Sequence, residues 1–488
     1  MKTPGAARLA VACAPVVLAF GMAATAADKI PITTSSEEAR QLYLKGRDLS
    51  EKLRATDARA FFQQAAAKDP GFALAQVGLA NSSGTAKEFF DAVARATLLA
   101  DKASEPERLL ICALDAGAKG EPARQTDCLT KLVAACPDDE RAHNQMGAYH
   151  FGRQDYAAAV AEYRKATAIN PAFSQPYNQM GYAYRFLGQY QEAERAFQKY
   201  IELIPNDPNP YDSYAELLMK MGRFEESIQS YEKALAVDPN FVASYVGIGN
   251  DRVFMGQPAE ARKTYAKLLR VARNDGEKLL AHFWTAMSHV HEGQTDAAVA
   301  ELQKNVEIDQ AGNDLVALSG TITLMGNILI EAGRVDAAEA KLREGLATIE
   351  KADVATQVKE AAQRQSLFDA SRVALARGDT ASAKAKATGY AAAVAAKSIP
   401  FELRQSHELQ GRIALAEKSY TAAAAELRQA NQQDPRVLYL TAVALQGQGD
   451  LLAAKKVGVQ AADFNGLSNT YGYVRGKAQA MLKSAKTN

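Results

Sequence analysis

The chain has 488 residues, which is long for one compact core and indicates either several domains or an extended array. Its 57 basic and 56 acidic residues nearly cancel, which argues against the basic surface of a nucleic-acid-binding protein. Alanine is abundant, only 8% of the residues are aromatic and there is one tryptophan, a composition that suits close-packed helices better than strands, so we expect almost no β-sheet.

Residues 1–27 have the three parts of a secretory signal peptide. Lys2 and Arg8 form the basic start, the apolar run LAVACAPVVLAFGMAA follows, and Ala-Thr-Ala-Ala closes the segment. We expect cleavage after Ala26 or Ala27. The mature protein then has a net charge of −1 instead of +1, because Lys2 and Arg8 are lost, and is expected in the periplasm or outside the cell.

A membrane anchor is the alternative for this segment. Pro15 and Gly21 interrupt the apolar run, which is short for a membrane span, and no charged stop-transfer flank follows it. No other segment is apolar enough to cross a bilayer, so we expect the protein not to span a membrane once the signal peptide is cleaved.

From residue 39 onward the sequence predicts a repeated two-helix pattern. Residues 73–105 and 106–139 are weaker copies of a unit that residues 39–72 fit well. The first three units are therefore expected to form three helical hairpins. In residues 39–72 the small, aromatic and proline positions are Gly46, Ala58, Phe62, Ala65 and Pro70.

The third unit contains all three cysteines that follow the signal peptide. Cys112 lies eight residues before Gly120 and Cys128 eight residues after it, so the two are level in an antiparallel helix pair that turns at Gly120. Cys136 lies eight residues further along, about 12 Å at 1.5 Å per residue, which is beyond the reach of a disulfide. We predict a disulfide between Cys112 and Cys128 in an oxidising compartment, and three buried reduced thiols are the alternative.

Four clear copies follow between residues 140 and 275 with a period of thirty-four residues. Asn144 recurs as Asn178, and each unit has a small residue and an aromatic residue at fixed positions of its second helix. The small residues let two helices approach closely, and the aromatic residues fill the space between hairpins. The small positions are Ala159, Ala193, Ser227 and Ala261, and the aromatic positions are Tyr163, Phe197, Tyr231 and Tyr265.

This pattern resembles the tetratricopeptide repeat family. The stretch FEESIQSYEKALAVDPN, Phe224 to Asn240, is almost a consensus second helix of that family with its closing Asp-Pro. The resemblance covers nearly the whole mature chain, strongly for residues 39–72 and 140–275 and weakly elsewhere. It implies an all-α fold, an α-solenoid in which about eleven or twelve antiparallel helical hairpins form a right-handed superhelix.

Residues 276–488 are expected to form a degenerate C-terminal array after the regular array of residues 28–275. Extra residues separate its copies, so either the chain bends or begins a subdomain near residue 276, or its helices grow by a turn. A final hairpin is expected to start near Leu438. The weak copies lie near residues 279–312, 319–352, 364–397 and 404–437.

The sequence offers no catalytic motif. The stretch HVHEGQT, His289 to Thr295, lacks the second histidine of the HExxH zinc motif, because Thr295 takes its place. There is no Gly-x-Ser-x-Gly elbow, phosphate-binding glycine loop or Cys-x-x-Cys pair. The histidines occupy packing positions of the repeat, so we expect neither a metal nor a cofactor. These histidines are His143, His150, His282, His289 and His407.

Binding is the function class that remains. The first helices of such hairpins line a concave wall that binds extended peptides or partner domains. Amide and aromatic side chains on this wall suit a polypeptide backbone, because an amide both donates and accepts hydrogen bonds, and a solvated helix surface is the alternative. The predicted partner-binding residues are Arg141, Asn144, Gln175, Asn178, Tyr182, Arg185, Asp212, Glu216 and Asn250.

We further expect that four of these residues lie exposed, so that their joint replacement by alanine abolishes binding and barely changes thermal stability. These four are Asn144, Asn178, Tyr182 and Arg185.

We therefore predict a non-catalytic scaffold or adaptor that binds a protein or an extended peptide through its concave surface in the cell envelope. The alternative is an enzyme-associated or envelope-modifying protein whose chemistry lies unrecognised in the C-terminal half. The fold of residues 276–488 bears on the choice. Continued hairpins favour the scaffold, whereas a compact pocket lined by histidines and carboxylates favours the enzyme.

Overall fold

The computed structural model of the protein describes residues 29–466 and 470–484. The expected signal peptide and its cleavage site lie outside these residues. None of the helices in the described residues is long and apolar enough to cross a membrane.

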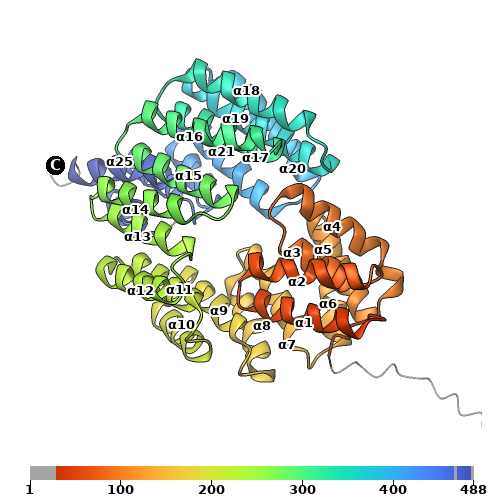
Figure 1. The fold of residues 1–488 in the computed structure, drawn as a ribbon. Coiled ribbons are helices and arrows are strands. Elements are labelled where there is room, and N and C mark those ends of the chain that lie inside the picture. Colours follow the sequence, from red (N-terminus) through yellow and green to blue (C-terminus); the bar gives the residue numbers. More distant parts are fainter. Residues whose placement is uncertain (1–28, 467–469, 485–488) are drawn as a thin grey trace, which may run out of the picture.

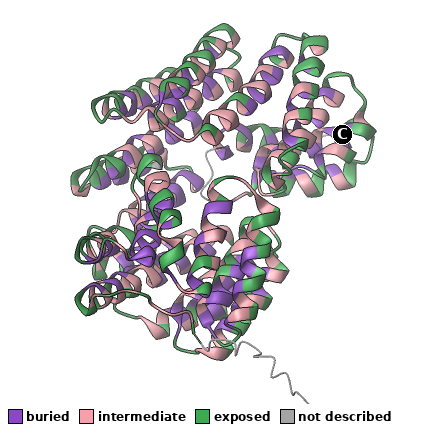
Figure 2. Cartoon of the chain, turned by 90° about the vertical axis from the view of Figure 1, so that its right-hand side faces the viewer, coloured by how far each residue is buried: buried purple, intermediate pink, exposed green. Residues whose placement is uncertain are grey.

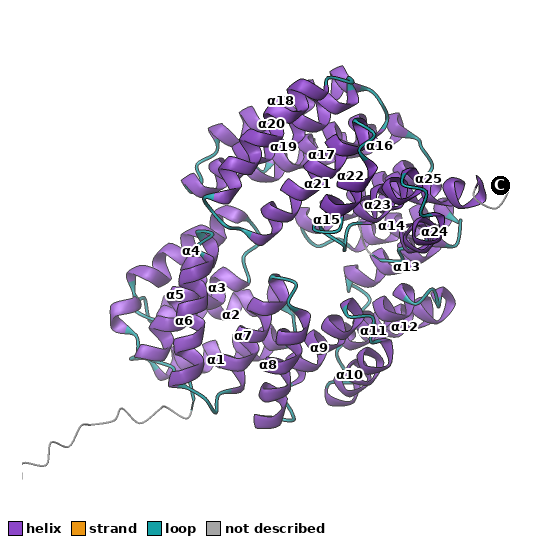
Figure 3. Cartoon of the chain, turned by 180° about the vertical axis from the view of Figure 1, so that it is seen from behind, coloured by secondary structure: helices purple, strands orange, loops and turns teal. Residues whose placement is uncertain are grey.

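The described residues form 25 α-helices, one short 3-10 helix and no strand, which confirms the predicted all-α fold (Figure 3). Consecutive helices pair as antiparallel hairpins, twelve in all, and buried residues lie on the faces where helices meet (Figure 2). The first seven hairpins consist of α1 (Glu37–Glu51) and α2 (Ala55–Lys68), α3 (Ala73–Asn81) and α4 (Ala86–Leu98), α5 (Glu105–Ala118) and α6 (Pro122–Ala135), α7 (Glu140–Gly152) and α8 (Tyr156–Ile169), α9 (Ser174–Phe186) and α10 (Tyr190–Leu203), α11 (Pro208–Lys220) and α12 (Phe224–Val237), and α13 (Val242–Phe254) and α14 (Pro258–Val271).

The helices between residues 275 and 416 are longer than those of the clear repeats. Helices α7 to α14 have 13 or 14 residues, whereas α15 to α18 have 17 each and α19 has 21. The extra residues of this region therefore extend the helices by about a turn. These later elements are α15 (Asp275–His291), α16 (Thr295–Ala311), α17 (Leu315–Glu331), α18 (Val335–Lys351), α19 (Thr356–Ala376), α20 (Thr380–Ala395), α21 (Pro400–Ala416), α22 (Tyr420–Leu427), α23 (Pro435–Gly447), α24 (Leu451–Ala462) and α25 (Tyr471–Ser484).

Three of the four clear hairpins have a glycine on the first helix that faces an aromatic ring on the second, and Ala215 takes the place of this glycine in the hairpin of α11 and α12. A Cβ atom added to Gly181 of α9 would lie 2.6 Å from the ring of Phe197 on α10. A Cβ atom added to Gly249 of α13 would lie 2.1 Å from the ring of Tyr265 on α14. The rings of Phe197 and Tyr265 are completely or almost completely buried. The predicted close approach of paired helices therefore depends on the missing side chain.

The array curls until its later hairpins meet its first ones, so the molecule resembles a ring (Figure 1). Gln154, in the turn between α7 and α8, donates a hydrogen bond from Nε2 to Oδ1 of Asn431 at 3.1 Å. Lys220 of α11 lies 4.0 Å from the ring centre of Phe464. Contacts between residues far apart in the sequence thus close the superhelix.

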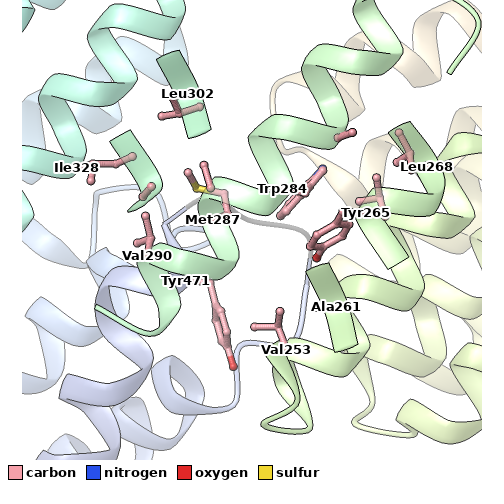
Figure 4. Close-up of a cluster of buried hydrophobic side chains, with 14 of the residues drawn as sticks. Val253, Ala261, Tyr265, Leu268, Trp284, Met287, Val290, Leu302, Ile328 and Tyr471 are labelled. Atoms are coloured by element: carbon pink, nitrogen blue, oxygen red, sulfur yellow. The ribbon is translucent and has the colours of Figure 1, made fainter. Parts of the chain in front are cut away.

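The last helix, α25, is a single helix that packs against α24, α23 and α15. The ring of Tyr471 stacks on His291 of α15 and contacts Phe254 of α13 at 4.7 Å between ring centres. Tyr471 belongs to one hydrophobic cluster with Tyr265, Trp284 and Met287, and this cluster crosses from the regular to the degenerate repeats (Figure 4). The concave face of these hairpins is therefore covered by the chain's own C-terminal helix.

Cys112 of α5 and Cys128 of α6 form a disulfide with their Cα atoms 6.0 Å apart. Cys136 is a free, buried cysteine at the end of α6. Burial raises the pKa of the Cys136 thiol to about 11, which keeps it protonated in the folded protein.

Thiol labelling measures this pairing in the protein as it is made by its own cell. We expect that a thiol reagent applied to the unfolded, non-reduced mature protein modifies Cys136 alone, because a disulfide has no thiol to react. Prior reduction should expose Cys112 and Cys128 as well, and mass spectrometry counts the labels. Three labels without reduction would contradict the pairing.

Candidate peptide groove

The first helices of the early hairpins face each other across a cavity of about 370 Å³. Helices α1 and α3 form one wall, and α7 and α9 form the other. We name this cavity the N-terminal groove. Its lining includes Tyr43, Arg47, Glu51, Gly78, Arg141, Asn144, Gln145, Ala148, Gln175 and Gln179.

An ion pair crosses the groove and fixes its width. Arg141 of α7 donates from Nε and Nη2 to the two carboxylate oxygens of Glu51 on α1, at 2.6 and 3.2 Å. It also donates from Nη1 to Glu140 at 2.6 Å. Burial alone would lower the pKa of Arg141, but the bonds and charges of Glu51 and Glu140 outweigh it and raise the pKa. Arg141 is therefore a permanent cation that bridges the two walls.

Amide side chains line the wall that α7 and α9 provide. Asn144 is only 6% exposed and donates from Nδ2 to Oε1 of Gln175 at 3.2 Å. The Oδ1 atom of Asn144 is buried and has no hydrogen-bond partner among the described residues. Gln145 is exposed and Gln179 is half-buried. The Oδ1 atom is enclosed by the protein, and an enclosed acceptor without a partner carries a free-energy cost.

The next predicted residues connect hairpins and are not free in the groove. Asn178 is only 1% exposed, and its Nδ2 donates to Oγ of Ser213 at 2.7 Å and to Oδ1 of Asn209 at 3.4 Å. Tyr182 donates from Oη to the same Ser213 at 3.3 Å. The expectation that these side chains lie exposed and can be replaced at little cost is therefore wrong for Asn178. The expectation is also wrong for the buried Asn144. Replacing either asparagine by alanine removes a hydrogen bond to the next hairpin.

A charged pair continues this connection between α9 and α11. Arg185 donates to Glu216 at 3.0 Å and lies over the ring of Tyr182. Asp212 is buried and accepts a hydrogen bond from Ser244 at 2.7 Å. Burial, and then the negative charge of Glu216, raise the pKa of Asp212. These groups stabilise the contact between consecutive hairpins.

Three of the nine predicted residues, Arg141, Asn144 and Gln175, thus meet in the N-terminal groove. Asn250 lies apart from them and donates to the carbonyl oxygen of Val246 in its own helix at 2.9 Å. Asn178, Tyr182, Arg185, Asp212 and Glu216 form the connecting network.

Sequence reasoning missed Gln145 and Gln179. They occupy one position of the repeat, thirty-four residues apart, as Asn144 and Asn178 do. The recurrence of glutamine at this repeat position could have identified both residues from the sequence. The wall that α1 provides had no comparable signal, because Glu51 meets Arg141 of α7 only when the superhelix curls.

The histidines lie in packing positions, as the repeat pattern predicts. His143 contacts Glu162 through Nδ1 at 2.7 Å, and His282 contacts Glu301 in the same way at 2.6 Å. In each pair the carboxylate belongs to the second helix of the same hairpin, nineteen residues further on. Within the described residues, no group of three or more His, Cys, Asp or Glu side chains is arranged to hold a metal ion.

Comparison with known proteins identifies the repeat. Tetratricopeptide repeat models match residues 140–173, 174–207, 215–250 and 246–313. No protein of curated function matches the sequence significantly.

Several solved structures are similar to parts of the chain. One is a tetratricopeptide repeat protein from Parabacteroides merdae, 16% identical over 55% of this chain and 92% of its own, with a TM-score of 0.35. The MamA protein is 21% identical over 34% of this chain and 91% of its own, with a TM-score of 0.30. YrrB, described as having an unusual peptide-binding site, is 17% identical over 37% of this chain and 92% of its own, with a TM-score of 0.26.

Proposed function

Because the chain is a tetratricopeptide repeat protein, we propose that it is a non-catalytic scaffold that binds an extended segment of a partner protein in the N-terminal groove. The observation that carries this proposal is the set of amide side chains that line the cavity together, Asn81, Asn144, Gln145, Gln175 and Gln179.

The chemistry of the groove matches a polypeptide backbone. An extended peptide presents N–H donors and C=O acceptors in alternation, and side-chain amides offer both kinds of group. The apolar rings of Tyr43 and Phe173 line the same cavity and offer contacts for a partner's side chains. Arg47 is half-buried at the wall and supplies a positive charge. A peptide of mixed character is therefore the ligand that this lining favours.

The C-terminal half supports the scaffold over the enzyme alternative. Its described residues continue as hairpins from α15 to α24. A polar cavity of about 320 Å³ lies between α17, α19, α21 and α23. Among its lining residues Asp434 is the only carboxylate, and there is no histidine. A second cavity of about 360 Å³ in this half is lined by three carboxylates, Glu339, Asp369 and Asp379, and also by no histidine.

We also propose that the protein is exported to the periplasm or beyond. The signal-like order of residues 1–27 and the pairing of Cys112 with Cys128 support this location, because disulfides persist in oxidising compartments. The thiol labelling described above tests it.

A blocking substitution tests the groove. We expect that Ala148→Trp, at an exposed position of the groove wall, weakens the binding of a peptide selected by the wild-type protein from a random peptide library. The indole occupies part of the cavity, so the Kd should rise about tenfold or more, which corresponds to about 1.4 kcal/mol. Fluorescence anisotropy measures the Kd.

Ala161→Trp is the matched control, because Ala161 is an exposed alanine on α8, the other helix of the same hairpin. It should bind like the wild type, and circular dichroism should show both variants folded. Wild-type binding by Ala148→Trp would refute the assignment of the groove.

A further inference from the structure

Residues 29–35, which we name the N-terminal segment, cross the first four hairpins without forming a helix or a strand. Backbone N–H groups of this segment donate to carboxylates of three different hairpins. Ile30 donates to Oδ2 of Asp139 at 2.8 Å, and Thr33 donates to Oε1 of Glu107 at 2.8 Å. Ser35 donates to Oδ2 of Asp69 at 3.0 Å.

Side chains of the segment strengthen this arrangement. The hydroxyl of Thr33 donates to Oε2 of Glu107 at 2.5 Å, and the hydroxyl of Thr34 donates to Oδ2 of Asp69 at 2.6 Å. Lys29 forms an ion pair with Glu140. The spacing between Ile30 and Thr33 fits an extended chain that passes from one hairpin to the next. Three extended residues span about 10 Å, which is close to the distance between the axes of packed helices.

The acceptors form a row of buried carboxylates at the beginnings of first helices. Asp139 caps α7, Glu107 lies in the first turn of α5, and Asp69 lies shortly before α3. Glu107 and Asp139 are each 1% exposed, so the segment shields them from water. We name Asp69, Glu107, Asp139 and Glu140 the carboxylate row.

Apolar side chains of the segment reach the core at alternate positions. Ile30 packs against the cluster that contains Leu129 and Met146, and Ile32 packs against the cluster of Tyr43 and Phe62. Both isoleucines remain half-exposed, and both also line the N-terminal groove. The segment therefore forms one side of the groove without being enclosed by the core.

We propose that the carboxylate row is a binding site for extended polypeptide segments and that residues 29–35 are its resident, exchangeable occupant. This inference rests on the proposed function and names the chemistry of the partner. The partner segment carries a basic group, two aliphatic side chains at alternate positions and then hydroxyl side chains. Its N–H groups replace those of Ile30, Thr33 and Ser35.

Exchange is feasible because release of the segment leaves every helix intact. Its N–H bonds go to side chains and not to helix carbonyl groups, so no helical hydrogen bond breaks. Such local openings cost less free energy than global unfolding. Release also opens one side of the N-terminal groove, where Ile30 and Ile32 form part of the lining.

A peptide competition experiment on the full mature chain tests the proposal. The probe is a fluorescent peptide with the sequence of residues 29–35, Lys-Ile-Pro-Ile-Thr-Thr-Ser. The chain variant Thr33→Pro lacks the N–H group that Glu107 accepts, so its own segment should be displaced. We expect the probe to bind this variant at least about tenfold more tightly than the wild type. In the wild type, residues 29–35 occupy the site in most molecules, and the apparent affinity is reduced in proportion to the fraction of molecules whose site is open.

A control peptide with proline in place of Thr33 should bind neither chain. If the probe bound both chains equally, its binding site would not be the carboxylate row. If it failed to bind a folded Thr33→Pro chain, residues 29–35 would not be exchangeable. Either result overturns the inference. The groove function is tested independently by the library-selected peptide and Ala148→Trp.

Native-state hydrogen exchange of the wild type decides the question if Thr33→Pro fails to fold. The amides of Ile30, Thr33 and Ser35 should exchange faster than those of α1 and α5, because the segment opens locally. Protection equal to that of these helices would overturn the inference.

Discussion

Alanine at Gly249 is expected to destabilise the protein strongly, whereas alanine at Gly320 is expected to stabilise it slightly. The new Cβ atom at position 249 would lie 2.1 Å from the ring of Tyr265, which is 1% exposed and has no room to move. Overpacking of this kind costs about 1–3 kcal/mol and occasionally more. At Gly320, within α17, nothing lies within 4 Å of the added Cβ atom.

The two substitutions are chemically identical, so their difference isolates the close approach of α13 and α14. Glycine in a helix costs about 0.5–1 kcal/mol relative to alanine, which is the gain expected at position 320. Thermal unfolding followed by circular dichroism measures both effects. Equal midpoints for the two variants would show that Gly249 is not needed for helix packing.

The substitution Asp251→Asn is expected to stabilise the protein at pH 8 and to lose this advantage near pH 4. Asp251 of α13 is completely buried, and neither carboxylate oxygen has a hydrogen-bond partner among the described residues. Burial, and to a lesser extent the charge of Glu225, raise the pKa of Asp251 to about 8. In the unfolded chain an aspartate has a pKa of about 3.9.

The sign of the effect follows from the proton count. Between these two pKa values the folded state holds more protons than the unfolded state, so the stability of the wild type falls as the pH rises from about 4 to about 8. Each unit of the pKa difference is worth about 1.4 kcal/mol. An asparagine side chain does not titrate, so the substitution removes this loss.

Urea unfolding of the wild type and Asp251→Asn at several pH values measures the difference. Asp127→Asn is the control, because it makes the same chemical change at an exposed carboxylate on α6. A constant offset between wild type and Asp251→Asn from pH 4 to pH 8 would contradict the raised pKa.

The hairpins could be predicted from the sequence because their packing is local and periodic. Gly181 and Phe197 lie sixteen residues apart, and so do Gly326 and Leu342 in a degenerate unit, where the leucine takes the place of the aromatic ring. The close contact between a glycine and a large side chain therefore recurs in the degenerate unit with leucine instead of an aromatic residue. The position of α25 could not be predicted, because Tyr471 contacts His291 and Phe254, which lie 180 and 217 residues earlier, and belongs to no repeat.

The candidate site could be predicted only in part, because some of its contacts join residues that the repeat pattern does not relate. The repeat places both Asn144 and Asn178 on the inner wall, and their chemistry is identical. Asn178 donates to Ser213 of the next hairpin, whereas Asn144 donates to Gln175 and its Oδ1 atom has no hydrogen-bond partner in the part of the chain that the structure describes. This difference depends on neighbours at other positions of the repeat, and the opposite wall forms only when the array curls.

Site-specific photo-crosslinking tests the groove most directly. A photoreactive amino acid is placed at Gln145, which is exposed in the groove wall, or at Ala161, which is exposed on the other helix of that hairpin. Each protein is irradiated with the library-selected peptide, and mass spectrometry identifies the products. Binding in the groove predicts a crosslink from position 145 and none from position 161. A crosslink from position 161 alone would contradict it.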